Sequence, residues 1–565
     1  MNRNRWAITA FAAIVPIALV SPCAHAELKL DYSYVDLKSD AYKRFKGWVD
    51  EAMSGRPGYA FSAIDAVTMF KLSGIGKYCD LAVSMTEQEV IAAEEKIAQG
   101  QRPEVAGDSY LEAGPRISAL ALTYDACGDR LQDAQRLRWA ALADRTIANI
   151  WNPAGATWGG TPAKWSGWSI DNPGNNYYYS FIEATMHWGL VSNNEQWLTL
   201  LRDDKLPALQ AYFAKLPGGG SLEGTGYGAA HMRLFALYRV WKDSTGVDLA
   251  NANPHASDSI RFWGHATMPT LDLFAPIGDQ SRVSVPEIYD YHRRLLLEAR
   301  VLSNDEKARD MASWWLHAIK LEQMTHGFNY RYDLLPAGEA GTPPPELNYH
   351  ASGTGHLFAR TGWDRDAMWF GFTAGPYLES HAHQDQGSFT LFAGDWLAVT
   401  ENIWTHSGIQ QGTDVHNVVR FVRGGETIRQ REGTVSTLLV PKLDAATGAV
   451  QAQADLTPAY AKGGGVESWT RAVDFAGRRL KISDTFSVGA GTHAIFQVNV
   501  PLKPVVEGRE ARAGKLRIKV LEPADATITT LEWSTLDKAE FRSGWRIDVQ
   551  GSGNAFVVEL TDDNG

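Results

Sequence analysis

The strongest constraint on the fold is a change in hydrophobic periodicity near the middle of the chain. Between about residues 40 and 324 apolar residues recur at helical spacing, as at Leu131, Leu137 and Ala141. Further on they alternate with polar residues, as at Leu480 and Ile482, which is the pattern of half-buried strands. A helical part followed by a strand-rich part predicts two different architectures in one chain.

These patterns predict a multidomain α+β chain. Helix pairs separated by Gly-, Pro- and Asn-rich loops indicate an α/α toroid, expected as an incomplete barrel over residues 27–340. Short alternating strands indicate an antiparallel β-sandwich over residues 341–565. The Pro-rich stretch 342–346 is the predicted linker.

Residues 1–26 have the layout of a secretory signal peptide. Arg3 and Arg5 precede an apolar run over residues 7–20, and small residues lead up to Ala26. The apolar run is too short to span a bilayer as a permanent anchor. We therefore expect cleavage after Ala26 and a periplasmic or secreted protein without a membrane anchor.

The charge balance argues against some classes of partner. The chain of 565 residues carries a net charge of -11, and loss of Arg3 and Arg5 would take it to -13. A protein this acidic is not expected to bind nucleic acid or a membrane surface. If the substrate is a polyanion, basic residues must gather at its cleft.

Two cysteines, Cys79 and Cys127, would remain after cleavage. In an exported protein such a pair favours a disulfide, and the alternative is two buried free thiols.

The segment from His381 to His416 holds a group of possible metal ligands. His381 and His383 would share one face of an extended strand, because side chains alternate along a strand. Imidazole and carboxylate groups are ligands that zinc accepts. The alternative is that these are ordinary core or surface histidines.

Residues 174–180, 220–231 and 352–417 form three blocks that together resemble one known family, the heparinase II/III-like polysaccharide lyases. Residues 174–180 resemble its Asn-Asn-His loop, with Tyr177 in place of the histidine. Residues 220–231 resemble its catalytic tyrosine block, and residues 352–417 resemble the start of its β-domain. The blocks lie in the order that the family has.

The resemblance implies β-elimination on a uronate polymer. The proton on C5, next to the carboxylate, is removed and the C4 oxygen is expelled. That reaction needs a group that neutralises the carboxylate, a base for the proton and an acid for the leaving oxygen.

Tyr227 is the expected base and acid. It precedes a helical pattern in which His231 would follow one turn later on the same face. The alternative for Tyr227 is an aromatic residue packed on the core, and His231 is as well explained by a hydrogen-bonded core residue as by catalysis.

The resemblance also places residues that contact the substrate. Asn176 and His381 would stabilise the carboxylate, whereas Asn175, Tyr177, Tyr178 and Arg360 would bind the sugar chain. Turn chemistry is the alternative for the two asparagines. Tyr177 puts in doubt any mechanism that needs a second base on the opposite face of the ring.

The metal ligands implied by the resemblance are His383, Glu401 and His416. Glu401 stands where the family has aspartate, and Asp385 and Asp414 are alternative carboxylates. A zinc ion at the junction of the two domains would be structural rather than catalytic.

The sequence therefore predicts an exported lyase that cleaves an acidic polysaccharide, with alginate or a related uronan first and a heparin-type glycosaminoglycan second. One rival is an α/α-toroid glycoside hydrolase that uses two carboxylates among Asp171, Glu183 and Glu223. Another is a non-catalytic polysaccharide-binding protein that grips sugars with some of its 20 Trp and 20 Tyr residues.

Overall fold

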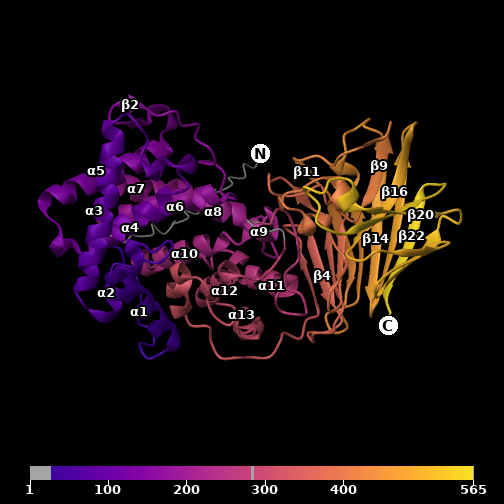
Figure 1. The fold of residues 1–565 in the computed structure, drawn as a ribbon, viewed down its shortest axis with the longest axis horizontal. Coiled ribbons are helices and arrows are strands. Elements are labelled where there is room, and N and C mark those ends of the chain that lie inside the picture. The colour runs from indigo at the N-terminus through magenta and orange to yellow at the C-terminus, as the bar shows by residue number, and fades with distance from the viewer. Residues whose placement is uncertain (1–26, 281–284, 564–565) are drawn as a thin grey trace, which may run out of the picture.

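The computed structural model describes residues 27–280 and 285–563, with helices in the first part and strands in the second (Figure 1). The last helical segment of the first part is the 3-10 helix η6 (Gly327–Leu334), and the next strand is β3 (Asn348–Ala351). The Pro-rich stretch 342–346 lies between them. The predicted order of helical region and β region is confirmed. The predicted signal peptide, residues 1–26, lies outside the described residues.

The helical region is built from α-helices of five to 22 residues. They are α1 (Asp40–Met53), α2 (Ala63–Ser73), α3 (Lys77–Ala98), α4 (Ala113–Ala126), α5 (Asp133–Trp151), α6 (Asn176–Ser192), α7 (Glu195–Leu200), α8 (Leu206–Phe213), α9 (Gly224–Gly228), α10 (His231–Thr245), α11 (His255–Ala266), α12 (Asp290–Leu302) and α13 (Glu306–Ala318). A π-helical turn, η5 (Leu201–Lys205), joins α7 to α8.

The inner helices form a ring. Helices α2, α4, α6, α10 and α12 pack side by side in that order, and η6 packs against both α12 and α2. Other helices cover the ring from outside: α3 lies against α2 and α4, α5 against α6, and α11 and α13 against α12. This is the α/α toroid that the sequence predicts.

Local sequence explains where an inner helix begins and ends. The side chain of Asn175 accepts a hydrogen bond from the Tyr177 N–H at 3.0 Å, which caps α6. Asn193 ends the helix in a left-handed conformation. Between these caps 12 of the 17 residues of α6 are buried, because neighbouring helices flank it on both sides.

Within the described residues, no helix is long and apolar enough to cross a membrane.

The β region consists mainly of three antiparallel sheets. Its strands are β3, β4 (His356–Arg360), β5 (Trp369–Thr373), β6 (Pro376–Tyr377), β7 (Phe389–Phe392), β8 (Trp396–Ala398), β9 (Val419–Arg423), β10 (Glu426–Thr427), β11 (Thr434–Val435), β12 (Thr437–Leu443), β13 (Val450–Asp455), β14 (Val466–Ala476), β15 (Arg479–Val488), β16 (Thr492–Val500), β17 (Val505–Glu507), β18 (Glu510–Ala513), β19 (Leu516–Glu522), β20 (Thr527–Glu532), β21 (Trp545–Gln550) and β22 (Ala555–Asp562). A small hairpin, β1 (Thr157–Trp158) and β2 (Thr161–Pro162), belongs to the helical region.

One large sheet has the order β12-β13-β14-β15-β22-β19-β18-β17. Two smaller sheets, β3-β4-β5-β7-β8 and β10-β9-β16-β21-β20, meet where β8 lies beside β16. Apolar side chains from the large sheet and both smaller sheets form one continuous core, so the region is a β-sandwich.

The two regions share a hydrophobic core. Phe358 and Trp369 of the sheet β3-β8 belong to the same buried cluster as the ring helices. The buried guanidinium of Arg360 donates hydrogen bonds to the main-chain oxygens of His265 and Thr267 at 2.9 and 2.8 Å. This contact holds the β region in a fixed position against α11.

Cys79 on α3 and Cys127 at the end of α4 form a disulfide, as expected for an exported protein. The bond closes a loop across 48 positions of sequence and ties an outer helix to an inner one.

We predict that Cys79→Ala/Cys127→Ala lowers the free energy of unfolding. A loop of this length corresponds to about 4 kcal/mol in the chain-entropy description. Urea unfolding of the oxidised wild type and the double variant measures the difference. A double variant as stable as the wild type would show that α3 and α4 hold together without the bond.

Candidate active site

A cavity of about 430 Å³ lies at one end of the ring, next to the β region. It brings together four residues that the sequence singles out: Asn176, Tyr177, Tyr227 and His381. The complete lining consists of Asp108, Leu111, Asn176, Tyr177, Gly226, Tyr227, Ala229, Ala230, Met232, Arg233, Tyr291 and His381. We call this cavity the active-site pocket.

Four ring helices begin at this pocket. Asn176 is the first residue of α6, Ala230 immediately precedes α10, and Tyr291 is the second residue of α12. Leu111 lies two residues before α4. The positive ends of four helix dipoles therefore face one cavity, which favours an anionic ligand.

Tyr227 and His381 stack face to face in the pocket. Their ring centroids are 3.6 Å apart and the rings are inclined by only 7°. Tyr227 lies on the short helix α9, whereas His381 comes from the loop between β6 and β7. A protonated imidazole in this position would favour the phenolate form of the tyrosine.

Gly224 lets α9 approach the loop that supports it. Its φ is +84°, and a Cβ there would lie 2.1 Å from the main-chain oxygen of Ile277. The next residue, Thr225, donates its N–H to that same oxygen at 2.8 Å. The short helix that carries Tyr227 is thereby fixed to residues 275–278.

Asp279, on the same loop, orients the histidines. Its carboxylate accepts hydrogen bonds from Nδ1 of His381 at 2.9 Å, Nε2 of His383 at 2.8 Å and the amide of Gln411 at 2.9 Å. Burial acts to raise the pKa of Asp279, but the hydrogen bonds outweigh it and the net pKa is lowered. The ionised carboxylate holds His381 in one tautomer and leaves its Nε2 for other partners.

Several carboxylates act on His381. Burial lowers its pKa, yet the hydrogen bond to Asp279 and the negative charges of Glu223, Asp279 and Glu379 give a net increase. Burial raises the pKa of Glu223 to about 7. The surroundings of His381 therefore favour its cationic form.

Tyr177 is less suited to take a proton. Its hydroxyl donates to Asp108 at 2.9 Å. Burial, together with this carboxylate, raises the pKa of Tyr177 to about 12. Its phenolate is therefore less accessible than that of an ordinary tyrosine.

The two asparagines have different positions. Asn175 is buried, caps α6 and lies 3.4 Å from a carboxylate oxygen of Glu223. Asn176 is partly exposed and lines the pocket. The turn-chemistry interpretation therefore explains Asn175, and Asn176 is the one that can reach a ligand.

His231 does not line the pocket. The expected continuous helix is broken between α9 and α10, so Tyr227 and His231 do not share a face. His231 lies buried among the rings of Tyr179, Phe213 and His255, where burial lowers its pKa well below the ordinary value. The structure makes it a core residue.

Tyr178 and Arg360 are also displaced from the expected binding role. Tyr178 is buried in the helical core, and its hydroxyl donates to the main-chain oxygen of Lys205. Arg360 is 1% exposed and its guanidinium stacks on Trp363. Neither lines the active-site pocket.

The predicted zinc ligands, His383, Glu401 and His416, each hold a buried polar atom without a hydrogen-bond partner. His381 and His383 lie in a loop rather than on a strand, and the His383 and His416 ring centroids are 5.1 Å apart. Across residues 27–280 and 285–563 no set of three His, Cys, Asp or Glu side chains is placed to hold an ion. Zinc remains an expectation from the family resemblance.

The side chain of Glu401 is buried. Both of its carboxylate oxygens are buried without a hydrogen-bond partner, and Gly544 lies against them. Burial raises the pKa of Glu401 to about 9. Of the alternatives, Asp414 accepts from Thr427 at 2.8 Å, and Asp385 is buried with its pKa raised to about 6.

The carboxylates suggested for a hydrolase are also scattered. Asp171 is exposed beside Lys205, Glu183 pairs with Arg233, and Glu223 is buried behind the pocket. Among the described residues that line the pocket, Asp108 is the one carboxylate. The two facing carboxylates of a glycoside hydrolase are not formed there.

The sequence analysis did not single out the pocket residues Asp108, Arg233 and Tyr291, nor Asp279, which bonds to His381 from outside the lining. Asp279 lies 102 positions from His381 and belongs to a loop without a recognisable motif. Arg233 follows Tyr227 by six residues, so a search for cations near the tyrosine block could have found it.

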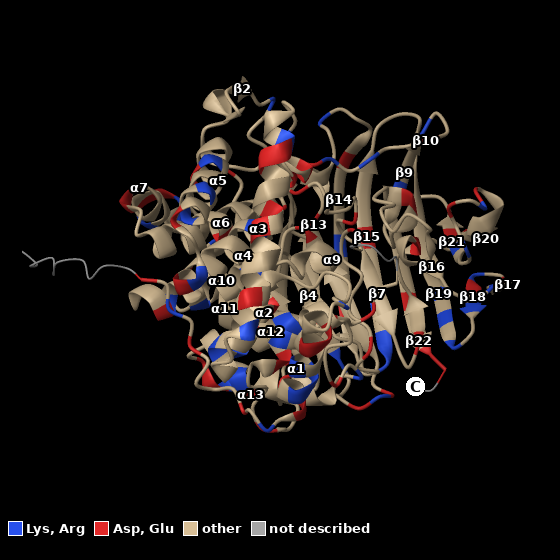
Figure 2. Ribbon diagram, turned by 60° about the vertical axis from the view of Figure 1, so that its left-hand side comes forward, with Lys and Arg blue, Asp and Glu red and all other residues tan. Residues whose placement is uncertain are grey.

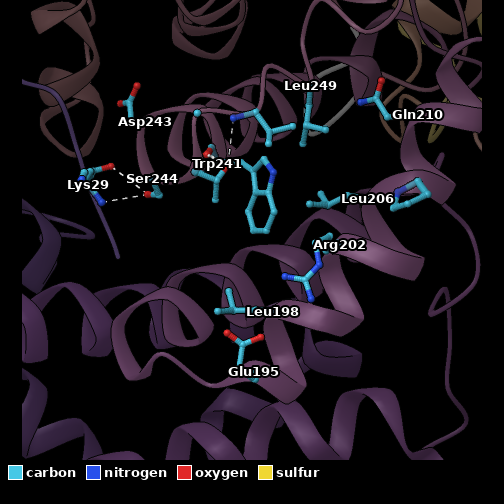
Figure 3. Close-up of a pocket in the computed structure, with 14 residues that line it drawn as sticks. Lys29, Glu195, Leu198, Arg202, Leu206, Gln210, Trp241, Asp243, Ser244 and Leu249 are labelled. Atoms are coloured by element: carbon cyan, nitrogen blue, oxygen red, sulfur yellow. Dashed lines mark hydrogen bonds between the residues drawn. The ribbon is translucent and has the colours of Figure 1, made fainter. Parts of the chain in front are cut away.

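A larger cavity of about 580 Å³ lies elsewhere, beside α7, η5 and the end of α10 (Figure 3). Trp241 lies near its centre in this view, with Arg202 and Glu195 on a neighbouring helical segment. None of the predicted catalytic residues lines it.

Comparison with known proteins agrees with this architecture. Residues 350–560 match the family model described as Heparinase II/III-like, C-terminal, which confirms the resemblance seen in the sequence. No curated protein sequence matches the chain.

Solved structures of similar fold cover nearly the whole chain. Heparan sulfate lyase HepC from Pedobacter heparinus is 14% identical, with 94% of this chain and 85% of that chain covered and a TM-score of 0.58. A heparinase III gene product is 12% identical, with 95% and 93% covered and a TM-score of 0.57. Chondroitin AC lyase from Streptomyces coelicolor A3, solved with chondroitin sulphate, is 12% identical, with 94% and 80% covered and a TM-score of 0.51.

We predict that Glu401→Gln stabilises the protein at alkaline pH. The folded pKa near 9 lies above the ordinary value of 4.5, so the folded state keeps a proton that the unfolded state loses. Stability should therefore fall as pH rises between these values, and the glutamine variant should avoid that loss. Its melting temperature should equal that of the wild type at about pH 5 and exceed it at about pH 8.

Glu346 is exposed, so Glu346→Gln is the matched control. It should leave the melting temperature unchanged at both pH values. If Glu401 instead binds zinc, Glu401→Gln would melt at a lower temperature and lose a metal that elemental analysis finds in the wild type.

Proposed function

We propose that this chain, a polysaccharide lyase of the heparinase II/III-like family, cleaves a uronate-containing acidic polysaccharide by β-elimination. The observation that carries the proposal is the stacked pair Tyr227 and His381, which shares a pocket with Asn176 at the meeting point of four helix N-termini.

The reaction first requires that the negative charge of the substrate carboxylate is neutralised. The amide of Asn176 and Nε2 of His381 can donate hydrogen bonds to it, and the helix dipoles add positive potential. Together they stabilise the negative charge that develops when the C5 proton leaves.

The reaction also requires proton transfer, which Tyr227 carries out. Its phenolate takes the proton from C5, the C4–O bond breaks as the C4=C5 double bond forms, and the phenol returns a proton to the departing oxygen. One side chain can do both when the proton and the leaving oxygen lie on the same face of the ring. The raised pKa of Tyr177 argues against a second base and favours a single epimer of uronate.

The lead substrate is alginate or a related uronan without sulfate groups. Arg233 is the one Lys or Arg among the described residues that line the pocket, and Glu183 lies 3.4 Å from its guanidinium. Figure 2 shows basic and acidic residues interspersed over the helical region rather than gathered into a basic stripe. Sulfate recognition would favour more clustered Lys and Arg.

A glycosaminoglycan is the second candidate. Solved structures of similar fold include a heparan sulfate lyase, a heparinase III and a chondroitin AC lyase.

A panel of alginate, other uronans, heparan sulfate and chondroitin sulfate tests the proposal, with ultraviolet absorbance as the readout. A lyase creates an unsaturated uronate that absorbs, whereas a hydrolase or a binding protein does not. The polymer with the highest kcat/KM identifies the substrate. No absorbance with any member of a broad panel would contradict the proposed reaction.

We also propose that the protein is exported, because residues 1–26 have the layout of a cleaved signal. Protein recovered from the native host should begin at Glu27. An intact Met1 would contradict export by this route.

We predict that Tyr227→Phe loses activity through kcat. The ring can still stack on His381, so the melting temperature and KM should change little, whereas loss of the proton carrier should lower kcat by roughly 100- to 10,000-fold. Asn176→Ala should also lower kcat, through weaker stabilisation of the carboxylate.

Tyr178→Phe is the matched control. Like Tyr227→Phe, it removes one tyrosine hydroxyl, but the hydroxyl of Tyr178 donates to the main-chain oxygen of Lys205 in the helical core. Its kcat should stay near that of the wild type. If Tyr227→Phe retains most of the activity, the proton carrier is another residue.

A further inference from the structure

A second cavity, of about 120 Å³, lies on the axis of the ring behind the active-site pocket. Each ring element, α2, α4, α6, α10, α12 and η6, contributes to its lining. On α12 the lining passes from Tyr291 in the pocket to Arg294 and Glu298 in this cavity. Arg233 lines both, so the axial cavity directly adjoins the active-site pocket.

The N-terminal segment lies across the other end of the axial cavity. Lys29 exchanges hydrogen bonds with Ser244, in the last turn of α10. Leu30, Tyr32 and Tyr34 of this segment line the cavity. The cavity is therefore bounded by the pocket on one side and by this segment on the other.

Arginine is the main charged residue of the axial cavity, and three of its four arginines are paired. Arg233 lies 3.4 Å from Glu183, and Arg239 forms two hydrogen bonds with Glu298 at 2.9 and 3.1 Å. Arg331 lies 2.6 Å from Asp65. The carboxylates of Glu183, Glu298 and Asp65 are therefore each already paired with an arginine.

Arg294 is the exception. Its guanidinium lies over the ring of Tyr332, 3.6 Å from the centroid, and its Nε is buried without a hydrogen-bond partner. In the part of the chain that the structure describes, no carboxylate pairs with it. Because arginine keeps its charge in proteins, the cavity holds one positive charge more than its carboxylates balance.

We infer that the axial cavity is a binding site for a small oxyanion, a sulfate or a carboxylate, held by the guanidinium of Arg294. The planar guanidinium can donate two parallel hydrogen bonds to either group. The volume exceeds that needed for a few water molecules but is below that of pockets for whole organic ligands. The ligand is therefore the acid group itself, free in solution or carried on a sugar that reaches in from the active-site pocket.

Titration calorimetry of the full-length protein tests the site with sodium sulfate at constant ionic strength in chloride. The wild type should bind sulfate at one saturable site. Arg294→Gln should bind sulfate at this site at least about tenfold more weakly. Arg294→Met, which keeps apolar contact with Tyr332, serves as a second variant. Both variants should melt no lower than the wild type without sulfate, because an unpaired and partly buried charge has been removed.

Arg202→Gln is the matched control. Arg202 lines the separate cavity of Figure 3 and pairs with the exposed Asp203 at 3.2 Å. This variant should bind sulfate as the wild type does.

Two further titrations distinguish the sources of the anion. Competition by glucuronate, but not by glucose, would assign the site to a sugar-borne acid. Binding of sulfate without competition by glucuronate would assign it to a free or ester sulfate. Absence of saturable sulfate binding by the wild type, or equal binding by both Arg294 variants, would overturn the inference whether or not the protein proves to be a lyase.

Discussion

The carboxylate of Asp279 joins the helical region to the β region at the active-site pocket. It comes from the loop that also anchors the Tyr227 helix, and it binds two histidines from the loop between β6 and β7. The stacking of His381 on Tyr227 thus depends on one buried anion with three hydrogen-bond donors. Because the regions also share a hydrophobic core, the pair is held on a rigid support.

The ring supplies the electrostatic setting for that pair. Inner helices that run in the same direction bring four N-termini to one end of the ring, where the pocket lies. A net acidic protein can therefore offer a locally positive cleft without a surface rich in Lys and Arg. Further along the axis, arginines paired with carboxylates line the interior. Arg294 has no such carboxylate, so its positive charge is not balanced.

The fold could be predicted because helical and alternating periodicities are strong and occupy separate parts of the chain. The pocket residues Asn176, Tyr227 and His381 could also be predicted, since each lies in a block that resembles a known family. Asp279 could not, because the loop it belongs to meets His381 only through the tertiary fold.

The errors have local causes. His231 follows Tyr227 at helical spacing, but the helix breaks between them and turns the histidine into the core. Arg360 is charged and close to a family motif, yet its guanidinium satisfies main-chain oxygens at the junction of the two regions. Helical spacing suggests His231 and the family resemblance suggests Arg360, and neither signal shows that the side chain is turned into the interior.

Digestion of the preferred polymer in water labelled with heavy oxygen distinguishes elimination in this pocket from hydrolysis. An elimination takes no oxygen from solvent at the cleaved bond. Products that are reduced at once, before the new reducing end exchanges its oxygen with water, should therefore be unlabelled in the mass spectrometer, and each pair should have one unsaturated end. Products that carry one heavy oxygen per cleaved bond and no unsaturated end would show hydrolysis and contradict the account.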